Sequence, residues 1–412
     1  MKKWLFSRKK AVEAETGAEQ IDLQMPRNAY YDQVSNVYHS LFLIFMAALL
    51  VFVVVAMLCN LDLFTYENFY YLAKDLGAAS DLLAGSGNVI NYEISARNQT
   101  FALYRGGLAV GGDSGLQLFN ATGRETLNTS PDYIEPILHG SDRYLMMYDI
   151  GEKRYSIYNS FVCVHHEECD YPIFAGAVSD SGYYATVSES YSHAGVVSLY
   201  NDHFELVNRY NRNEMVTCVA VSDAGDRVAF ATAGMKDGAY VTTLVIAVPG
   251  QDKTSVEMPL EGVFPYSVSF IDRQRVLLVC DRATYVVSVD DGMVITPVLY
   301  ADMKLAYAAN NSEYVALVFS MNAVTDTYQM LITDKNGSAV LLETFDASIR
   351  QIALHDKYLY VLTENSVARI SPTDQSYSLI ECSSEGNRML VCSKDEVLLC
   401  GSRSAVYYTF ED

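Results

Sequence analysis

The sequence predicts an all-β protein, a β-propeller of about eight four-stranded blades that follows one transmembrane α-helix and a short linker helix. Three observations lead to this prediction. A nineteen-residue apolar segment lies near the N-terminus, short apolar runs separated by Asp, Asn, Ser and Gly begin near residue 88, and hairpin-like units recur every 36 to 48 residues. The 31 tyrosines and single tryptophan are also typical of β structure.

The apolar segment LFLIFMAALLVFVVVAMLC covers residues 41–59. As a helix it rises about 1.5 Å per residue, which is enough to cross a hydrocarbon core of about 30 Å. It is longer than the apolar part of a signal peptide, and bulky Leu58 before Cys59 does not suit a cleavage site. We therefore expect a retained single-pass anchor in place of a buried core helix.

Basic residues predict the orientation of this anchor. MKKWLFSRKK opens the polar segment 1–40, whereas acidic Asp62 and Glu67 follow the span. Because basic flanks stay on the inner side, residues 1–40 are expected to form a cytoplasmic tail without regular structure, and the C-terminal domain lies outside the cell membrane. Residues 60–87 are expected to form an amphipathic linker helix.

The charge of the outer part narrows the classes of partner. Beyond residue 60 there are 23 Lys and Arg against 45 Asp and Glu, a formal charge of −22. Nucleic acid requires basic patches, so it is not expected as a partner. The same charge keeps a large domain soluble and away from anionic lipid.

Two segments carry the repeat most clearly. AVSDSGYYATVSES at 177–190 matches AVSDAGDRVAFATA at 220–233, and each predicts a strand, a Ser-Asp-x-Gly turn and a second strand. Weaker copies complete eight units within residues 88–412 at the spacing of propeller blades, although seven blades remain open because the first unit is faint. The last unit has three strands, and NVINYEI at 88–94 is predicted to supply the fourth and close the ring.

A single span followed by repeats such as DYPIFAGAVSDSGYYATVSES resembles an uncharacterised family of membrane-anchored propellers, with WD40-like or quinoprotein-like repeats, from Gram-positive bacteria. The stretch GGLAVGGDSGLQLFNATG is also similar to repeats of quinoprotein-like propellers such as the outer-membrane assembly lipoprotein. The tryptophan docking pattern of those proteins is missing here, so no quinone or other cofactor is expected. Neither resemblance implies a catalytic residue.

The segment CVHHEEC at 163–169 combines thiols, imidazoles and carboxylates. Alignment of the repeats places it on the fourth, outermost strand of a blade. Six extended residues span about 20 Å, too far for a disulfide, and neighbouring side chains point to opposite faces. An ordinary strand is the preferred interpretation, ahead of a local disulfide and then a metal site formed by Cys163, His165, Glu167 and Cys169.

Other chemical motifs are weaker. Cys392 and Cys400 lie on two arms of one predicted hairpin and are candidates for a disulfide, although seven outer cysteines leave at least one unpaired within a chain. GDSG at 112–115 resembles the nucleophile motif of trypsin-like proteases, but a blade turn explains it better. We find no further catalytic, cofactor-binding or metal-binding motif.

These observations predict a single-pass membrane protein whose outer propeller is a non-catalytic protein-interaction scaffold at the cell envelope, with an envelope protein or a wall polymer as partner. The alternative is a small-ligand sensor, or an enzyme of the hydrolase or lactonase type, that uses the central channel. That alternative requires polar groups converging there, whereas the first strands, such as TCVAV and LAYAA, are small and apolar. Fold alone does not decide between them.

Overall fold

The computed structural model describes residues 29–59 and 88–410, apart from residues 96, 131–132, 142, 161, 252, 322–325 and 384–385. The chain divides into two compact units, Met1–Ala79 and Ser80–Asp412, and each is described by itself. The linker helix predicted for 60–87 lies outside the described residues.

The described part of the first unit is the helix α1 (Ala29–Cys59), of 31 residues. It includes the whole predicted span, but it begins twelve residues earlier than the apolar segment. Residues 29–40, which we expected to lack regular structure, are therefore helical. Once a helix is nucleated, each added residue costs little, and AYYDQVSNVYHS contains neither Pro nor Gly to stop it.

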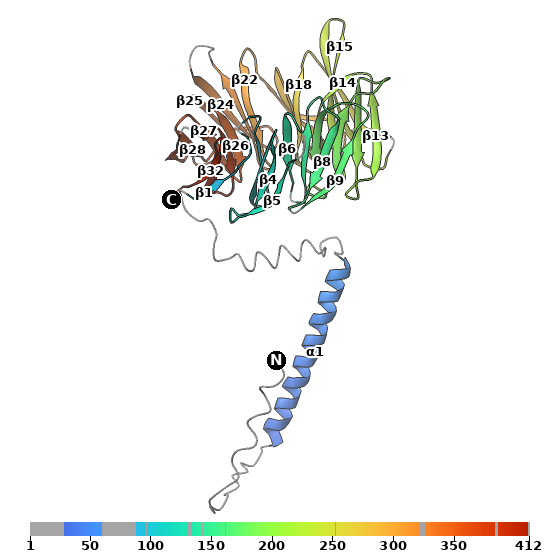
Figure 1. The fold of residues 1–412 in the computed structure, drawn as a ribbon, viewed down its shortest axis with the longest axis vertical. Helices are drawn as coiled ribbons and strands as arrows, with labels where there is room; N and C mark the ends of the chain where they lie inside the picture. Colours follow the sequence, from blue (N-terminus) through green and yellow to red (C-terminus); the bar gives the residue numbers. More distant parts are fainter. Residues whose placement is uncertain are drawn as a thin grey trace, which may run out of the picture. The chain divides into compact units, whose positions relative to one another are not determined.

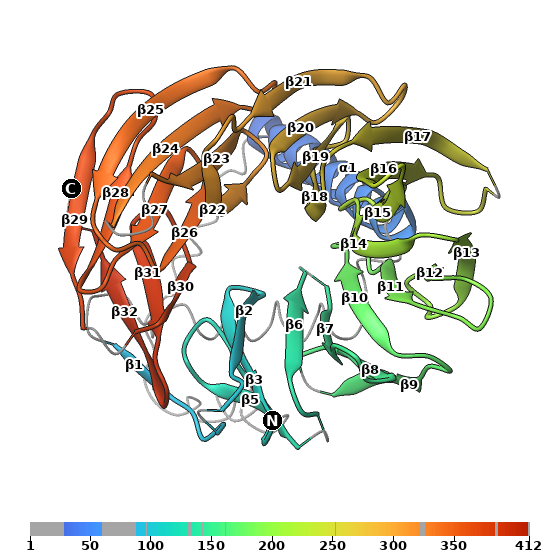
Figure 2. The same cartoon turned by 90° about the horizontal axis from the view of Figure 1, so that it is seen from above.

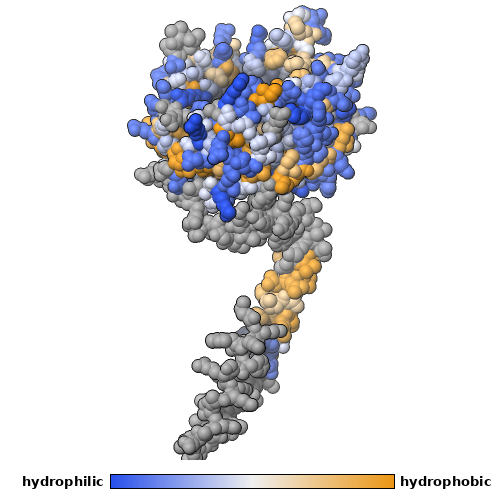
Figure 3. Space-filling view, viewed as in Figure 1, coloured by the Kyte–Doolittle hydropathy of each residue, from blue (hydrophilic) through white to orange (hydrophobic). Residues whose placement is uncertain are grey.

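The length and composition of α1 are compatible with a membrane anchor. Residues 34–52 form a nineteen-residue window of mean hydropathy 1.9, and none of this window is buried inside the structure. Figure 3 shows hydrophobic side chains along most of the described part of α1, whereas the visible surface of the propeller is mostly hydrophilic. A length of nineteen helical residues suits the hydrocarbon thickness of a bilayer.

The second unit is a ring of eight four-stranded antiparallel sheets (Figure 2), which confirms the predicted β-propeller and its eight blades. Each of blades 1 to 7 is one continuous stretch of chain, and its first strand lies nearest the centre of the ring. Blade 1 consists of β2 (Thr100–Tyr104), β3 (Gly107–Gly112), β4 (Gly115–Phe119) and β5 (Glu125–Thr129), and blade 2 of β6 (Pro136–Gly140), β7 (Leu145–Asp149), β8 (Arg154–Tyr158) and β9 (Cys163–Glu168). Blade 3 consists of β10 (Ile173–Val178), β11 (Tyr184–Ser188), β12 (Gly195–Tyr200) and β13 (Leu206–Arg212), and blade 4 of β14 (Met215–Val221), β15 (Val228–Lys236), β16 (Ala239–Ala247) and β17 (Thr254–Glu261).

The strands of blades 5 to 8 follow the same order, except that the last blade takes its outer strand from the beginning of the domain. Blade 5 consists of β18 (Pro265–Asp272), β19 (Arg275–Cys280), β20 (Ala283–Ser288) and β21 (Val294–Leu299), and blade 6 of β22 (Lys304–Asn310), β23 (Tyr314–Ser320), β24 (Thr327–Asp334) and β25 (Ala339–Asp346). Blade 7 consists of β26 (Gln351–His355), β27 (Tyr358–Leu362), β28 (Ser366–Ile370) and β29 (Tyr377–Glu381), and blade 8 of β30 (Arg388–Val391), β31 (Glu396–Cys400), β32 (Ser404–Thr409) and β1 (Val89–Asn91).

The turn chemistry explains why the repeats fold as hairpins. In the β10–β11 turn the Gly182 amide donates to the Ser179 carbonyl at 3.0 Å, and the Ser179 hydroxyl donates to the Tyr183 carbonyl at 2.9 Å. Gly182 and Gly225, the last residues of the two Ser-Asp-x-Gly turns, have φ of 91° and 71°, values that glycine adopts at low cost. The predicted turns are therefore present.

The ring closes as predicted, because β1 pairs antiparallel with β32 from Val89 opposite Val406 to Asn91 opposite Ser404. Outer strands also carry Pro259 and Pro297, in β17 and β21. Proline cannot donate a ladder hydrogen bond, so it is tolerated at such edges and discourages pairing with a further strand.

The two faces of the ring carry different loops. We call distal the face with the turns between second and third strands and the connections between blades. The opposite, proximal face carries the turns between first and second strands and between third and fourth strands. Because β1 runs antiparallel to β32, which starts at a distal turn, the chain enters the ring at the proximal face.

The core lies between blades, where alternate residues of neighbouring sheets interdigitate. Between blades 3 and 4, for example, it consists mainly of Ala185, Val187, Val197, Leu199, Val228, Phe230, Val245 and Ala247. All eight are essentially solvent-free. Burial of this kind contributes about 1.5–3 kcal/mol for each large apolar side chain.

Candidate functional site

The CVHHEEC segment forms β9, the fourth and outermost strand of blade 2. His165 and His166 point to opposite faces, as expected for a strand: His165 Nε2 lies 3.1 Å from Glu167 Oε2, and His166 Nδ1 lies 2.9 Å from Ser156 Oγ. Cys163 and Cys169 are both free thiols. The register of β9 against β8 shifts between His165, which lies opposite Ile157, and Cys163, which lies opposite Tyr158. Of the four metal candidates, the side chains of His165 and Glu167 contact each other, whereas the Cys163 thiol donates to the His165 backbone carbonyl at 3.2 Å.

Across the described residues, no group of three or more His, Cys, Asp or Glu side chains is arranged to hold a metal ion. Burial, helped by the charges of Glu167 and Asp170, raises the pKa of the Cys169 thiol to about 11. A neutral thiol is a poor metal ligand and a poor nucleophile.

The structure does not support the disulfide predicted between Cys392 and Cys400. Cys400 lies opposite Arg388, at the end of the hairpin away from its turn, whereas the Cys392 amide bonds the Glu396 carbonyl beside the turn. The two thiols are free and occupy different rows of the hairpin. The prediction placed them on the correct arms but did not account for the short turn, which fixes the register.

GDSG is the turn between β3 and β4, with Gly112 paired to Gly115. Polar groups of the first strands near the ring centre also bond across blades: Ser269 Oγ donates to Asn310 Oδ1 at 2.9 Å, and the Gln351 amide exchanges two bonds of 2.8 Å with the Met389 backbone. These groups hold adjacent blades together.

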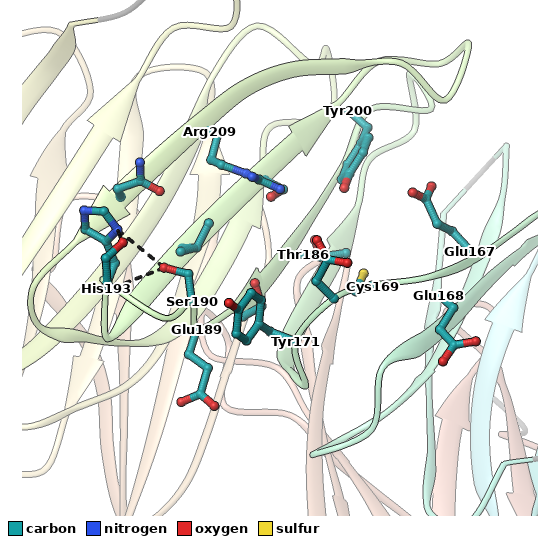
Figure 4. A pocket seen from close by; sticks show the side chains of 16 residues that line it. Glu167, Glu168, Cys169, Tyr171, Thr186, Glu189, Ser190, His193, Tyr200 and Arg209 are labelled. Atoms are coloured by element: carbon teal, nitrogen blue, oxygen red, sulfur yellow. Dashed lines mark hydrogen bonds between the residues drawn. The ribbon is translucent and has the colours of Figure 1, made fainter.

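The most clearly built site is a cleft of about 370 Å³ between blades 2 and 3. One wall is the end of β9 and its connection to β10, residues 167–171, and the other is the face of β11, β12 and β13 with the β11–β12 turn. Figure 4 shows Arg209, Tyr200 and Thr186 on blade 3 across from the Glu167 and Glu168 side chains.

Strand alternation explains the polarity of the cleft. In β11 and β12, Ala185, Val187, Val197 and Leu199 face blade 4 and join its core. The intervening residues face blade 2, and those that line the cleft are Thr186, Ser188, Val196, Ser198 and Tyr200. We did not predict this site from the sequence, although the polar alternate positions were visible in it.

Tyrosines close the cleft on its proximal side. The Tyr184 and Tyr200 rings stack at 4.7 Å, and the Tyr155 hydroxyl lies 3.2 Å from the Tyr184 hydroxyl and donates to Glu167 Oε2 at 3.2 Å. Burial raises the pKa of Tyr155 and of Tyr184, so these phenols stay neutral hydrogen-bonding groups.

The rim is charged and predominantly acidic. Glu167, Glu168, Asp170 and Glu189 contribute carboxylates, against the guanidinium of Arg209. His193 Nδ1 lies 3.4 Å from Ser190 Oγ, but that oxygen accepts the His193 backbone N–H at 3.1 Å, which is the geometry of a turn. Within the described part of the cleft, the imidazole of His193 contacts no carboxylate that would orient it as in a Ser-His-Asp triad. The cleft can therefore bind a polar ligand through many hydrogen bonds.

Fold and topology define this molecule as an eight-bladed β-propeller that follows an N-terminal apolar helix. The chain belongs to a family of unknown function, DUF5711, whose model matches residues 87–400. No curated protein matches the sequence.

Solved structures match this chain at low sequence identity. The computationally designed protein Ika8 matches with a TM-score of 0.57 and 11% identity, over 79% of this chain and 100% of Ika8. The WD40 domain of Neurospora crassa Pan2 matches with a TM-score of 0.48 and 7% identity, over 80% of this chain and 97% of that domain.

Proposed function

We propose that this protein is a membrane-anchored scaffold whose propeller binds a protein partner without catalysing a reaction. The observation that carries the proposal is a group of apolar and aromatic side chains on the distal face. It consists of Met235 and Tyr240 on the β15–β16 hairpin with Phe264 and Tyr266 at the start of blade 5, and we call it the hairpin patch. Met235, Tyr240 and Tyr266 are exposed.

The hairpin patch lies on an ordered β-hairpin that projects from the ring. β15 and β16 have nine residues each, and their hairpin extends beyond the neighbouring blades (Figure 1). Its turn is Asp237-Gly238, with φ of 52° and 83°, which matches the twist of paired strands. The Tyr240 and Phe264 rings meet edge to face at 5.6 Å, and the Phe264 amide donates to Asp281 at 2.8 Å.

These properties suit a protein interface. Aromatic and methionine side chains are enriched in the cores of such interfaces and provide much of the binding energy. A group that is already ordered loses little conformational entropy when a partner binds. The negative charge of the outer part would then limit partners to those of compatible surface charge.

Replacing Met235, Tyr240 and Tyr266 by serine is expected to abolish partner capture. The experiment is cross-linking on intact membranes, followed by affinity purification of the full-length protein and mass spectrometry. Each deleted anchor should cost about 1–2 kcal/mol of binding, so the triple variant should recover the partner at least a hundredfold less well.

Tyr191, which is 97% exposed in a different turn of the distal face, supplies the matched control. Tyr191→Ser should retain the partner. Equal recovery of the same proteins by the wild type and the triple variant would count against the hairpin patch as the binding surface.

The proposed topology, with the N-terminus inside and the propeller outside, makes a separate prediction. Cys163 is an exposed thiol, whereas the other six cysteines of the propeller are partly or fully buried. A membrane-impermeant maleimide should therefore label Cys163 in intact cells, at mildly alkaline pH because partial burial raises the pKa of this thiol. Cys163→Ser is the control. Labelling that required cell lysis would reverse the proposed orientation.

A further inference from the structure

The cleft between blades 2 and 3 exists because polar side chains replace apolar ones at equivalent positions. Thr186 and Ser198 face each other across β11 and β12. Their counterparts in blade 4 are Phe230 and Val245, which face each other across β15 and β16 and fill the space against blade 3. Small hydroxyl residues leave the corresponding space beside blade 2 open.

Thr186 and Ser198 are buried polar groups at positions where blade 4 has the apolar side chains of Phe230 and Val245. Their exposed fractions are 2% and 4%, and their hydroxyls lie beside that of Tyr200. Each hydroxyl offers one donor and two acceptor positions, so contact with one neighbour leaves capacity for a ligand. Buried polar groups are destabilising unless they are hydrogen-bonded, which gives a polar ligand an advantage over an apolar one in this cleft.

We propose that this cleft binds a saccharide that is neutral or carries an amino group. Sugars present adjacent hydroxyls that both donate and accept, and the hydroxyls of the floor and the carboxylates of the rim complement them. The Tyr171 and Tyr200 rings provide apolar surface for the C–H groups of a sugar ring. The excess of carboxylates over the single guanidinium of Arg209 disfavours an anionic polymer and favours an ammonium group. The volume of about 370 Å³ is within the range of small-ligand sites.

The test is a calorimetric titration of the full-length protein, in detergent, with soluble oligosaccharides. The probes are oligomers of glucose, N-acetylglucosamine and glucosamine, with oligogalacturonate as the anionic comparison and a tri-lysine peptide as the non-sugar comparison. At least one neutral or amino oligosaccharide should bind, and oligogalacturonate should bind at least tenfold more weakly.

Thr186→Val and Ser198→Val should each weaken oligosaccharide binding at least tenfold, because each removes a hydroxyl from the floor. Thr186→Val nearly preserves the side-chain shape, and Ser198→Val introduces the residue that blade 4 has at this position. Thr232→Val, which alters a buried hydroxyl outside the cleft, is the matched control and should bind normally. Glu189→Gln, on the exposed rim, should weaken an amino-sugar oligomer without disturbing the fold.

Three results would overturn the proposal: no oligosaccharide binding, binding that is unchanged in Thr186→Val, Ser198→Val and Glu189→Gln, or tighter binding of tri-lysine than of any sugar. The hairpin patch lies in other blades, so its triple serine variant should bind the oligosaccharide normally. Failure of the cleft and failure of the scaffold proposal are therefore distinguishable.

Discussion

Replacing Ile90 by alanine is expected to lower the free energy of unfolding of the propeller by about 3 kcal/mol. Ile90 lies in β1, the strand that closes the ring, and is 2% exposed. It packs with Leu398 and Ala405 of blade 8 and with Leu108 of blade 1. The substitution leaves a cavity at the junction where the two ends of the propeller meet, so the lost contacts involve both neighbouring blades.

Val89 provides a matched control for Ile90, because it is the adjacent residue of the same short strand but is 47% exposed. Val89→Ala should change the free energy of unfolding by no more than about 0.5 kcal/mol. The two variants are compared by urea unfolding of the full-length protein in detergent, and unfolding is monitored by the near-ultraviolet circular dichroism of the tyrosines. Similar losses for the two variants would mean that the buried side of β1 does not hold the ring closed.

The repeating architecture was predictable because its determinants are local. Each blade begins with a hairpin whose turn is set by a few polar residues, which in blades 1, 3 and 4 include a glycine such as Gly182, and the spacing of these turns gives the number of blades. Closure by residues 88–94 followed from arithmetic, since the last unit had one strand too few.

The cleft could not be predicted in the same way. The alternation that places Thr186 and Ser198 on one face of blade 3 is visible in the sequence, but a polar residue facing a neighbouring blade looks identical to one facing solvent. Only the packing of blade 2 against blade 3 distinguishes them, and that depends on contacts between residues far apart in the chain. The hairpin patch has the same limitation, because Tyr240 and Tyr266 belong to different blades.

Strand register and helix ends were the other features in which the structure differed from the sequence-based prediction. The position of Cys392 relative to Cys400 depends on where the β30–β31 turn falls, and a shift of a few residues decides whether two cysteines face each other. The beginning of α1 at Ala29 reflects helix propagation into a polar segment, which an apolar window does not detect.

Replacing Arg369 is expected to cause the second large loss in the free energy of unfolding. It lies in β28 of blade 7, its side chain is 6% exposed, and it contacts the carboxylate of Asp395 in the β30–β31 turn of blade 8. Its guanidinium also lies over the rings of Phe410, at 4.7 Å, and Tyr358, at 5.2 Å. One buried cation thus joins blade 7 to the turn and the C-terminal strand end of blade 8.

Arg369→Ala is expected to lower the free energy of unfolding by about 3 kcal/mol, because it removes an almost buried guanidinium together with its ion pair, its hydrogen bonds and two cation–π contacts. Arg369→Lys should recover less than half of this loss, since an ammonium group lacks the planar surface that stacks on the rings. The measurement is the same urea unfolding experiment.

A double-mutant cycle with Asp395→Ala separates the ion pair from the stacking. Asp395 is 39% exposed, so water screens part of the interaction, and the coupling energy should be about 1–2 kcal/mol. The remaining loss on removing Arg369 then belongs to its packing against Phe410 and Tyr358 and to its hydrogen bonds to the Lys394 carbonyl and Ser378 Oγ. Arg282→Ala removes a 74% exposed cation near Asp281 and should have an effect below about 0.5 kcal/mol. If Arg369→Ala were no more damaging than Arg282→Ala, the contact between blades 7 and 8 would not depend on this cation.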